Sequence, residues 1–181
     1  MYDAVGIPAD TAISARTTAA RILSSAGINT RWTQCPCDGA VTSAELLVRI
    51  VTAPPTNESA SLGFSYVDVE QRRGTLATVF ADRIHALAQA SGVADADLLG
   101  RAIAHEIAHL LLGTRDHAET GLMRGQWTSI ELARNRPIDW QLTRADSARM
   151  RQALIRRQRP PAPPPMTIAK RETHAEALSA P

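Results

Sequence analysis

Two histidines and a glutamate at helical spacing are the residues of this sequence best suited to chemistry. They are His105, Glu106 and His109, in the segment HEIAH. On a helix, residues four positions apart lie on the same face, so both imidazoles can reach one ion. Zinc accepts histidine nitrogens as ligands, and its catalytic sites keep one position open for water. Glu106, next to the first histidine, can then act as general base on that water.

A third protein ligand has to come from outside this helical turn. Gly113 is expected to end the helix, because a glycine there lets the chain reverse direction. His117 follows four residues later and is our first candidate for the third ligand. Three carboxylates remain as alternatives, Asp116, Glu119 and Glu131, and so does a site with no third protein ligand.

This stretch resembles the metzincin metallopeptidases, whose zinc site combines a helix bearing HExxH, a glycine turn, a third histidine and a methionine in a tight turn. The corresponding residues here are His105, Glu106, His109, Gly113, His117 and Met123. The resemblance implies one catalytic zinc ion, Glu106 as base, Met123 as a hydrophobic floor under the ligands, and a peptide or protein substrate. The usual spacing, HExxHxxGxxH, would place glycine and histidine where this sequence has Leu112 and Arg115.

The chain is also similar to a group of small bacterial predicted zinc-dependent proteases. The similarity covers much of residues 1–127 and includes the runs HLLLG, AGI and VFADRI. It implies a zinc-dependent endopeptidase and does not extend to the C-terminal tail.

The N-terminal part of the chain shows the pattern of a βαβ unit. A short strand over residues 2–7 is followed by a helix that Asp10 can cap and Gly27 ends. Residues 28–33 then alternate, with Ile28, Thr30 and Trp32 on one side, which predicts a half-buried strand. The two strands are expected to be parallel, with a right-handed crossover.

Further strands are expected over residues 46–51, 62–69 and 75–81. The last two read as an antiparallel hairpin, joined by a charged turn in which Gly74 suits a positive φ. A peptide substrate could pair with whichever hairpin strand has an exposed edge.

Helices are expected on both sides of the histidines. Asp82 can cap a short helix that Gly92 ends, and the HEIAH helix should start near Asp95 or Asp97 and run to Leu112. Beyond residue 127, Thr128 or Ser129 can cap a helix reaching Asn135, which Pro137 terminates, and residues 143–157 form a last candidate helix.

Together these elements predict an α+β domain over residues 1–158 with metzincin-like architecture. A mixed, twisted sheet would pack on the active-site helix within residues 1–113, and residues 114–158 would supply the metal loop and small C-terminal helices. The run RPPAPPP predicts that residues 159–181 form a Pro-rich, disordered tail.

Composition excludes several classes of protein. The chain has 181 residues, of which 44% are hydrophobic and 21% charged, with a net charge of +2. These values are ordinary for a soluble globular domain. No run of 18 apolar residues occurs, so no membrane span is expected.

No signal peptide is apparent after Met1, which predicts a cytoplasmic protein, or a secreted one if the true start lies upstream. Cys35 and Cys37 are expected to be free thiols, because a disulfide across one residue would be strained.

Two other classes fit parts of the sequence. A non-catalytic zinc-binding protein on the same fold is one, although Glu106 argues against it, because a structural site needs no base. A basic interaction module is the other, built on residues 144–159, where six arginines face one aspartate. Without interleaved aromatic residues, a solvated helix face is favoured there over nucleic-acid binding.

Overall fold

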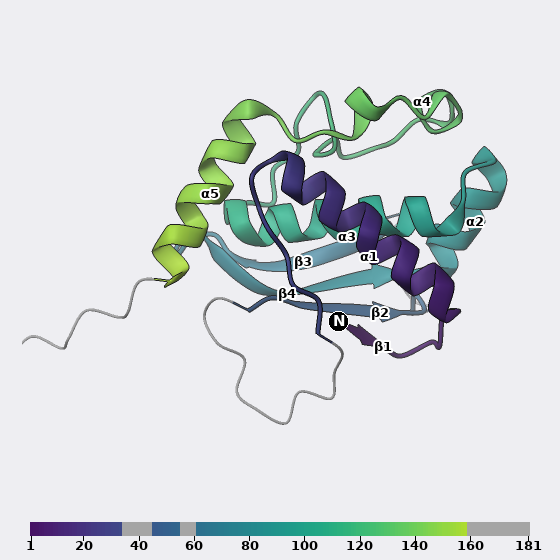
Figure 1. Cartoon of the computed structure of the whole chain (residues 1–181), viewed down its shortest axis with the longest axis horizontal. Helices are drawn as coiled ribbons and strands as arrows, with labels where there is room; N and C mark the ends of the chain where they lie inside the picture. The colour runs from purple at the N-terminus through teal and green to yellow at the C-terminus, as the bar shows by residue number, and fades with distance from the viewer. Residues whose placement is uncertain (34–44, 55–60, 159–181) are drawn as a thin grey trace, which may run out of the picture.

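A four-stranded mixed sheet forms one layer of the molecule. The computed structural model describes residues 1–33, 45–54 and 61–158 (Figure 1). The strands are β1 (Tyr2–Asp3), β2 (Leu47–Val51), β3 (Gly63–Asp68) and β4 (Arg73–Phe80), in the spatial order β1-β2-β4-β3. β1 pairs with β2, and β2 with β4, in parallel, whereas β3 pairs with β4 in an antiparallel hairpin. The expected mixed sheet and α+β class are therefore confirmed.

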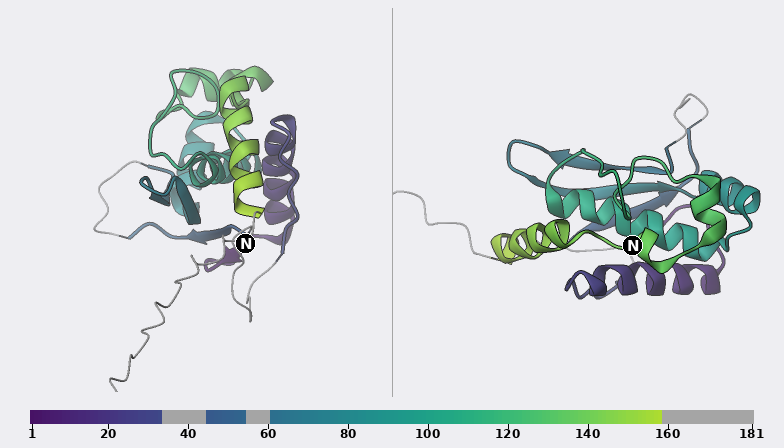
Figure 2. Two further views of the ribbon diagram at one scale, coloured as in Figure 1. Left: turned by 90° about the vertical axis from the view of Figure 1, so that its left-hand side faces the viewer. Right: turned by 90° about the horizontal axis from the view of Figure 1, so that it is seen from above.

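Helices cover one face of this sheet. They are α1 (Ala9–Ser25), α2 (Ala81–Ser91), α3 (Asp95–Leu112), α4 (Ser129–Arg134), the 3-10 helix η1 (Pro137–Trp140) and α5 (Arg144–Gln158). α1 and α3 lie side by side on the sheet, and α4 and the chain before it lie beyond α3 (Figures 1 and 2). No helix in the described ranges is long and apolar enough to span a membrane.

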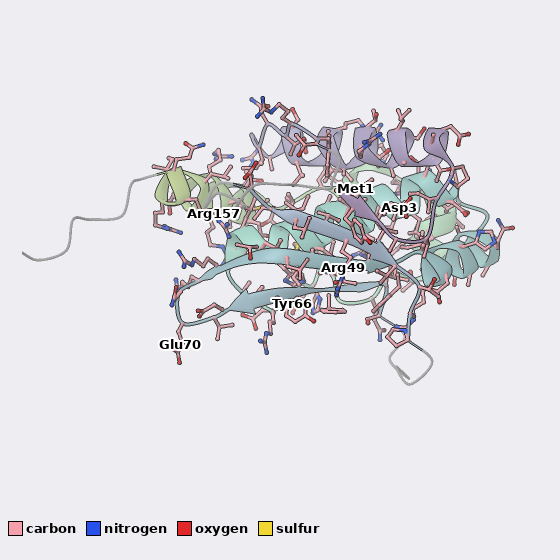
Figure 3. The ribbon with its side chains drawn as sticks, turned by 90° about the horizontal axis from the view of Figure 1, so that it is seen from below. Met1, Asp3, Arg49, Tyr66, Glu70 and Arg157 are labelled. Atoms are coloured by element: carbon pink, nitrogen blue, oxygen red, sulfur yellow. The ribbon has the colours of Figure 1, made fainter. Side chains whose placement is uncertain are left out.

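The opposite face of the sheet is shown in Figure 3. Arg49 lies on this face and donates from Nε and Nη2 to Thr78 Oγ1, at 3.2 and 3.0 Å. Tyr66 also lies on it and is 54% exposed. The core of the molecule therefore sits between the sheet and α3, on the side where the histidines are.

α3 is the most enclosed element described. Every residue from Leu98 to Leu111 is buried, because the sheet, α1 and the C-terminal segment surround this helix. Gly100 allows α1 to come close, since a Cβ there would stand 2.6 Å from Ala15 O and 2.7 Å from Thr18 Cβ. Thr18 Oγ1 in turn donates to Asp97 Oδ1 at 3.1 Å. A helix so buried holds its polar side chains in fixed positions.

Gly113 ends α3 as expected. Its φ is 65°, in the left-handed region that favours glycine, and its N–H donates to His109 O at 2.9 Å. A Cβ on Gly113 would overlap main-chain atoms of Arg72. The turn of the β3–β4 hairpin therefore packs directly on the C-terminal end of α3.

The predicted strand over residues 28–33 is wrong. These residues form no strand, although their burial alternates as expected, with Ile28 buried and Trp32 half-buried. The parallel partner of β1 is β2, so the βαβ unit closes at Leu47–Val51. An alternating pattern shows which side chains are buried, but not whether the main chain pairs with a strand. Here the segment runs from the end of α1 towards Met1, whose amino group donates to Thr33 O at 2.6 Å.

Three local expectations also need correction. Gly74 lies within β4, and the turn residue with positive φ is Arg72, at 49°. A Cβ on Gly74 would instead clash with Tyr66 O, so a glycine is needed here to let β3 and β4 approach each other closely. The residue preceding α1 is Pro8, and the one preceding α2 is Phe80; Asp10 and Asp82 lie in the first turns of those helices.

The arginines of α5 attach this helix to the rest of the fold. Arg151 Nη1 donates to Ala26 O at 2.7 Å, and Arg157 Nη2 donates to Gly74 O and Leu110 O at 2.5 and 2.9 Å. Arg149 pairs with Asp146 at 2.5 Å. Arg151 and Arg157 thus connect α5 to other elements, whereas the Arg149 pair lies within α5. Cys35, Cys37 and the 159–181 tail lie outside the described residues.

Candidate metal centre

Three imidazoles meet at the surface of α3. His105 and His109 project from the helix, and His117 comes from the loop that follows Gly113. One nitrogen from each ring lies within 4.8 Å of those of the other two. The Nε2 atoms of His105 and His109 are 3.0 Å apart. Two nitrogens bound to one tetrahedral zinc ion would be about 3.3 Å apart, so this pair is already close to coordination geometry.

The hydrogen bonds of His105 and His109 establish where their protons are. His105 Nδ1 donates to Leu122 O and His109 Nδ1 donates to Thr114 O, both at 2.9 Å. A carbonyl oxygen can only accept, so each neutral ring holds its proton on Nδ1 and has a lone pair on Nε2. The two lone pairs therefore face each other, an arrangement that a bound cation would stabilise. The donor set fits a metal ion.

Burial keeps these two rings neutral. Desolvation lowers the pKa of His105 to about 4, with a further decrease from the proximity of His109. Desolvation also lowers the pKa of His109, against an opposing hydrogen bond to Thr114. Both Nε2 lone pairs are thus available at neutral pH, as metal ligation requires.

The loop bearing His117 is anchored at several points. Ala118 N donates to Met123 O at 2.8 Å, and Leu122 N donates to Gln141 O at 2.9 Å. Met123 is buried in the core, as a hydrophobic floor would be. Gly125 leaves room for the exposed His117, because a Cβ there would lie 3.2 Å from His117 Cγ.

Glu106 places a carboxylate in the same cleft. The residue is 6% exposed, and Ser65 Oγ lies 2.7 Å from its Oε2 and 2.8 Å from its main-chain oxygen. Desolvation raises the pKa of Glu106 to about 7, although the Ser65 hydrogen bond acts in the opposite direction. Gly63 is needed beside it, because a Cβ there would lie 2.5 Å from Thr78 O and 3.1 Å from Glu106 Oε1.

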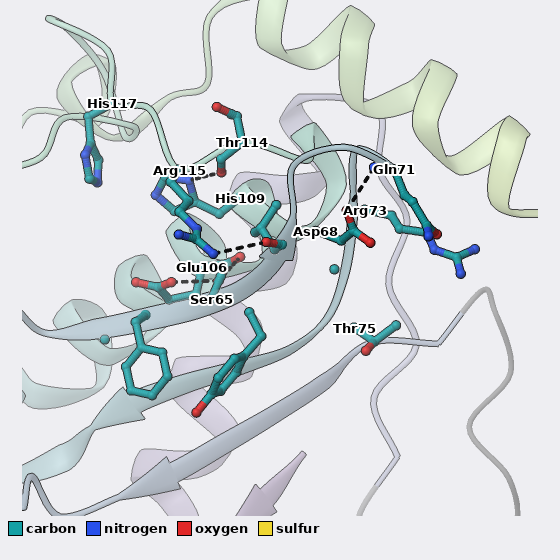
Figure 4. A pocket seen from close by; sticks show the side chains of 15 residues that line it. Ser65, Asp68, Gln71, Arg73, Thr75, Glu106, His109, Thr114, Arg115 and His117 are labelled. Atoms are coloured by element: carbon teal, nitrogen blue, oxygen red, sulfur yellow. Dashed lines mark hydrogen bonds between the residues drawn. The ribbon is translucent and has the colours of Figure 1, made fainter.

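The cleft has a volume of about 870 Å³ and runs along β3 (Figure 4). Glu106, His109 and His117 line it, together with all residues of β3 and part of the hairpin turn. Among the described strands β3 is an edge strand that pairs with β4 alone, so half of its main-chain N–H and C=O groups point away from the sheet. His109, His117 and the open edge of β3 therefore face one space.

The structure brings His117, and none of the three carboxylate alternatives, to the histidine pair. Glu131 Oε2 accepts from Thr128 N and Oγ1 in the capping box of α4, and Glu131 also forms an ion pair with Arg124. Asp116 Oδ2 accepts from Thr114 Oγ1 at 2.6 Å, and Glu119 is exposed. Among the described residues, the group that could hold a metal ion is His105, His109 and His117.

Several residues of the site were not identified from the sequence. Ser65, Gly63 and Gly125 contact the predicted residues, and Leu122 and Thr114 orient the histidines through their carbonyl oxygens. Alternation within the predicted strand 62–69 indicates on which face of the sheet Ser65 lies, but it does not indicate that Ser65 contacts Glu106. Carbonyl acceptors leave no signal in a sequence.

The centre thus combines three convergent imidazoles, a buried carboxylate and a free strand edge. Comparisons of the chain with protein-family models, curated proteins and solved structures found no match. The function is therefore inferred from geometry and chemistry.

Proposed function

We propose that this chain is a zinc-dependent peptidase with a metzincin-like fold. The main support is the convergence of His105, His109 and His117, together with a cleft lined by His109, His117 and the buried Glu106 carboxylate. A structural metal site would need neither a carboxylate nor a cleft beside the ligands.

The proposed roles follow from position. The three histidines hold zinc, which when bound supplies a Lewis acid that lowers the pKa of water and polarises a carbonyl group. Glu106 accepts the proton of the attacking water and delivers it to the leaving amine. Ser65 positions this carboxylate by hydrogen bonding to Oε2, which leaves Oε1 for the proton.

The proposed substrate is an extended peptide bound along β3. β4 is paired on both sides, by β2 and β3, so within the part of the chain that the structure describes β3 is the hairpin strand with an open edge. A peptide added to this edge would gain main-chain hydrogen bonds and would pass directly by Glu106 and His109.

Metal content tests the ligand set. Purified wild-type protein should hold about one zinc ion per chain, measured by plasma mass spectrometry. His117→Ala should lose most of the metal, because two ligands from one helical turn hold zinc far less tightly. Glu131→Ala is the matched control and should keep it, since Glu131 serves the α4 cap. Retention by His117→Ala with loss by Glu131→Ala would overturn the assignment.

Hydrolysis is tested separately with Glu106→Gln. This variant should keep its zinc but lose about 100-fold or more in kcat, because positioned general bases contribute factors of that size. The assay is cleavage of a denatured protein followed by mass spectrometry. If wild type holds zinc yet cleaves nothing, the non-catalytic zinc protein is the correct class.

A further inference from the structure

Arg115 is a cationic side chain in the cleft that the proposed hydrolysis does not use. It lies between Thr114, whose carbonyl orients His109, and His117. Its guanidinium reaches across the cleft towards β3, where Nη2 is 3.4 Å from Val67 O (Figure 4). The side chain thus stands over the strand edge beside the histidines.

The guanidinium has spare hydrogen-bonding capacity. It presents five N–H donors, and its contact with Val67 O is long. Within the described ranges it forms no ion pair. The nearby acids have other partners: Asp116 accepts from Thr114 Oγ1, and Asp68 Oδ1 accepts from Gln71 N at 2.9 Å.

The position of Arg115 along β3 determines what it could meet. Val67 lies two residues beyond Ser65, which contacts Glu106, and two residues of a strand span about 7 Å. A peptide extended along β3 has nearly the same spacing. A group one or two residues from the scissile bond would therefore lie at the guanidinium, and Arg73 adds a second positive charge at that end of the cleft.

We propose that Arg115 forms a carboxylate-binding subsite, so that preferred substrates present a carboxylate one or two residues from the scissile bond. The inference rests on the proposed peptidase function. The planar guanidinium fork matches a carboxylate through two parallel hydrogen bonds, which lysine cannot reproduce. Either an acidic side chain or the C-terminus of a peptide can supply the carboxylate.

Matched peptides test the subsite. One arm compares Glu, Gln and Lys at the positions flanking the cleaved bond, and the other compares a free C-terminus with its amide. Wild type should favour the carboxylate form at least about 10-fold in kcat/KM, as a charge-assisted pair of modest strength gives. The arm that shows the difference identifies the source of the carboxylate.

Arg115→Glu should abolish this preference or reverse it towards Lys, and Arg115→Lys should keep only part of it. Arg156→Glu is the matched control, because it makes the same charge change at an exposed position on α5. Zinc content and circular dichroism should be equal in all four proteins. The subsite would be overturned if wild type cleaved all peptides equally. It would also be overturned if wild type and Arg115→Glu ranked the peptides in the same order of kcat/KM.

Binding separates this inference from the proposed hydrolysis. Fluorescence anisotropy of labelled peptides should show tighter binding of the carboxylate form by wild type but not by Arg115→Glu. If that difference is found without any cleavage, the subsite stands and the peptidase proposal fails. If no labelled peptide binds, or all bind equally, the subsite is wrong whatever the activity.

Discussion

Glu106 is a carboxylate placed where a charge is unfavourable. It lies on the most buried helix described, with the Ser65 hydroxyl hydrogen-bonded to one oxygen. Burial raises its pKa to about 7. In metal-free protein this side chain therefore opposes folding at neutral pH, a cost that a purely structural residue would not need.

The pH dependence of stability should reveal this cost. Unfolded Glu106 ionises near pH 4.5, but the folded residue keeps its proton until about pH 7. As pH rises between these values the unfolded state loses its proton first, so stability falls. In metal-free protein, Glu106→Gln should remove this fall and be more stable above pH 7, by on the order of 3 kcal/mol. Urea unfolding of both proteins at pH 4.5 and 7.5 measures the difference; parallel behaviour of the two would contradict the burial argument.

The sequence predicts the site residues that depend on local spacing. His105, Glu106 and His109 follow from helix geometry, and His117 follows from its closeness to Gly113. Ser65 is separated from Glu106 by 41 positions, so no local pattern connects them. Residues that orient a site across such separations become visible only once the chain has folded.

Among the structural elements, the end of α3 determines how the cleft is built. Gly113 closes the helix and touches the hairpin turn at Arg72, while the next residues supply Thr114, Arg115 and His117. The hairpin on one side of the cleft and the 114–117 segment on the other therefore meet where Gly113 packs against the main chain of Arg72.

Two glycines with the same φ test that contact. Gly92 and Gly113 both follow helices with φ of 65°, but a Cβ added to Gly92 would have no neighbour within 4 Å. Gly92→Ala should cost about 1 kcal/mol of stability from its left-handed backbone. Gly113→Ala should cost about 1–3 kcal/mol more, because its Cβ meets the Arg72 main chain. Chemical denaturation measures the free energy of unfolding of both variants. Equal losses would contradict the proposed contact, because they would mean that the hairpin turn at Arg72 moves aside at no cost.

Elements with clear end signals were predictable, and those defined by partners were not. α3 has acidic residues at its start and a glycine at its end, and its bounds match the expectation. Residues 28–33 have the alternation of a strand, but a strand also needs a neighbour with free hydrogen-bonding groups, and β2 occupies that place beside β1. Gly74 was misjudged for a similar reason, because its close contact is with Tyr66 across the hairpin.

At the scale of the whole molecule, the three-histidine cluster joins two parts of the chain. α3 contributes two histidines, and the 114–128 loop contributes the third together with the carbonyls of Thr114 and Leu122. Leu122 also bonds to Gln141, so the centre is connected to the C-terminal segment. A metal bound there would act as a cross-link between helix and loop.

Removal of the metal should therefore lower the melting temperature. A ligand at 100 times its Kd stabilises the folded state by about 2.7 kcal/mol, which corresponds to about 5–10 °C in a domain of this size. Calorimetry with and without a chelator measures the shift, and added zinc should restore the original Tm. His117→Ala should respond much less. A chelator-independent Tm in wild type would show that no metal contributes to the fold.

Tryptophan rings lie against this centre. Trp127 contacts His105 edge-on, with ring centroids 5.8 Å apart, and its Nε1 donates to Leu122 O at 3.4 Å. Trp140 packs on Trp127 at 5.4 Å, so two of the three tryptophans of the chain form one cluster with the imidazole. The fluorescence of Trp127 and Trp140 therefore originates beside the His105 imidazole. The molecule thus contains its own fluorescent reporter, which distinguishes a charged from a neutral environment at the histidines without any added label.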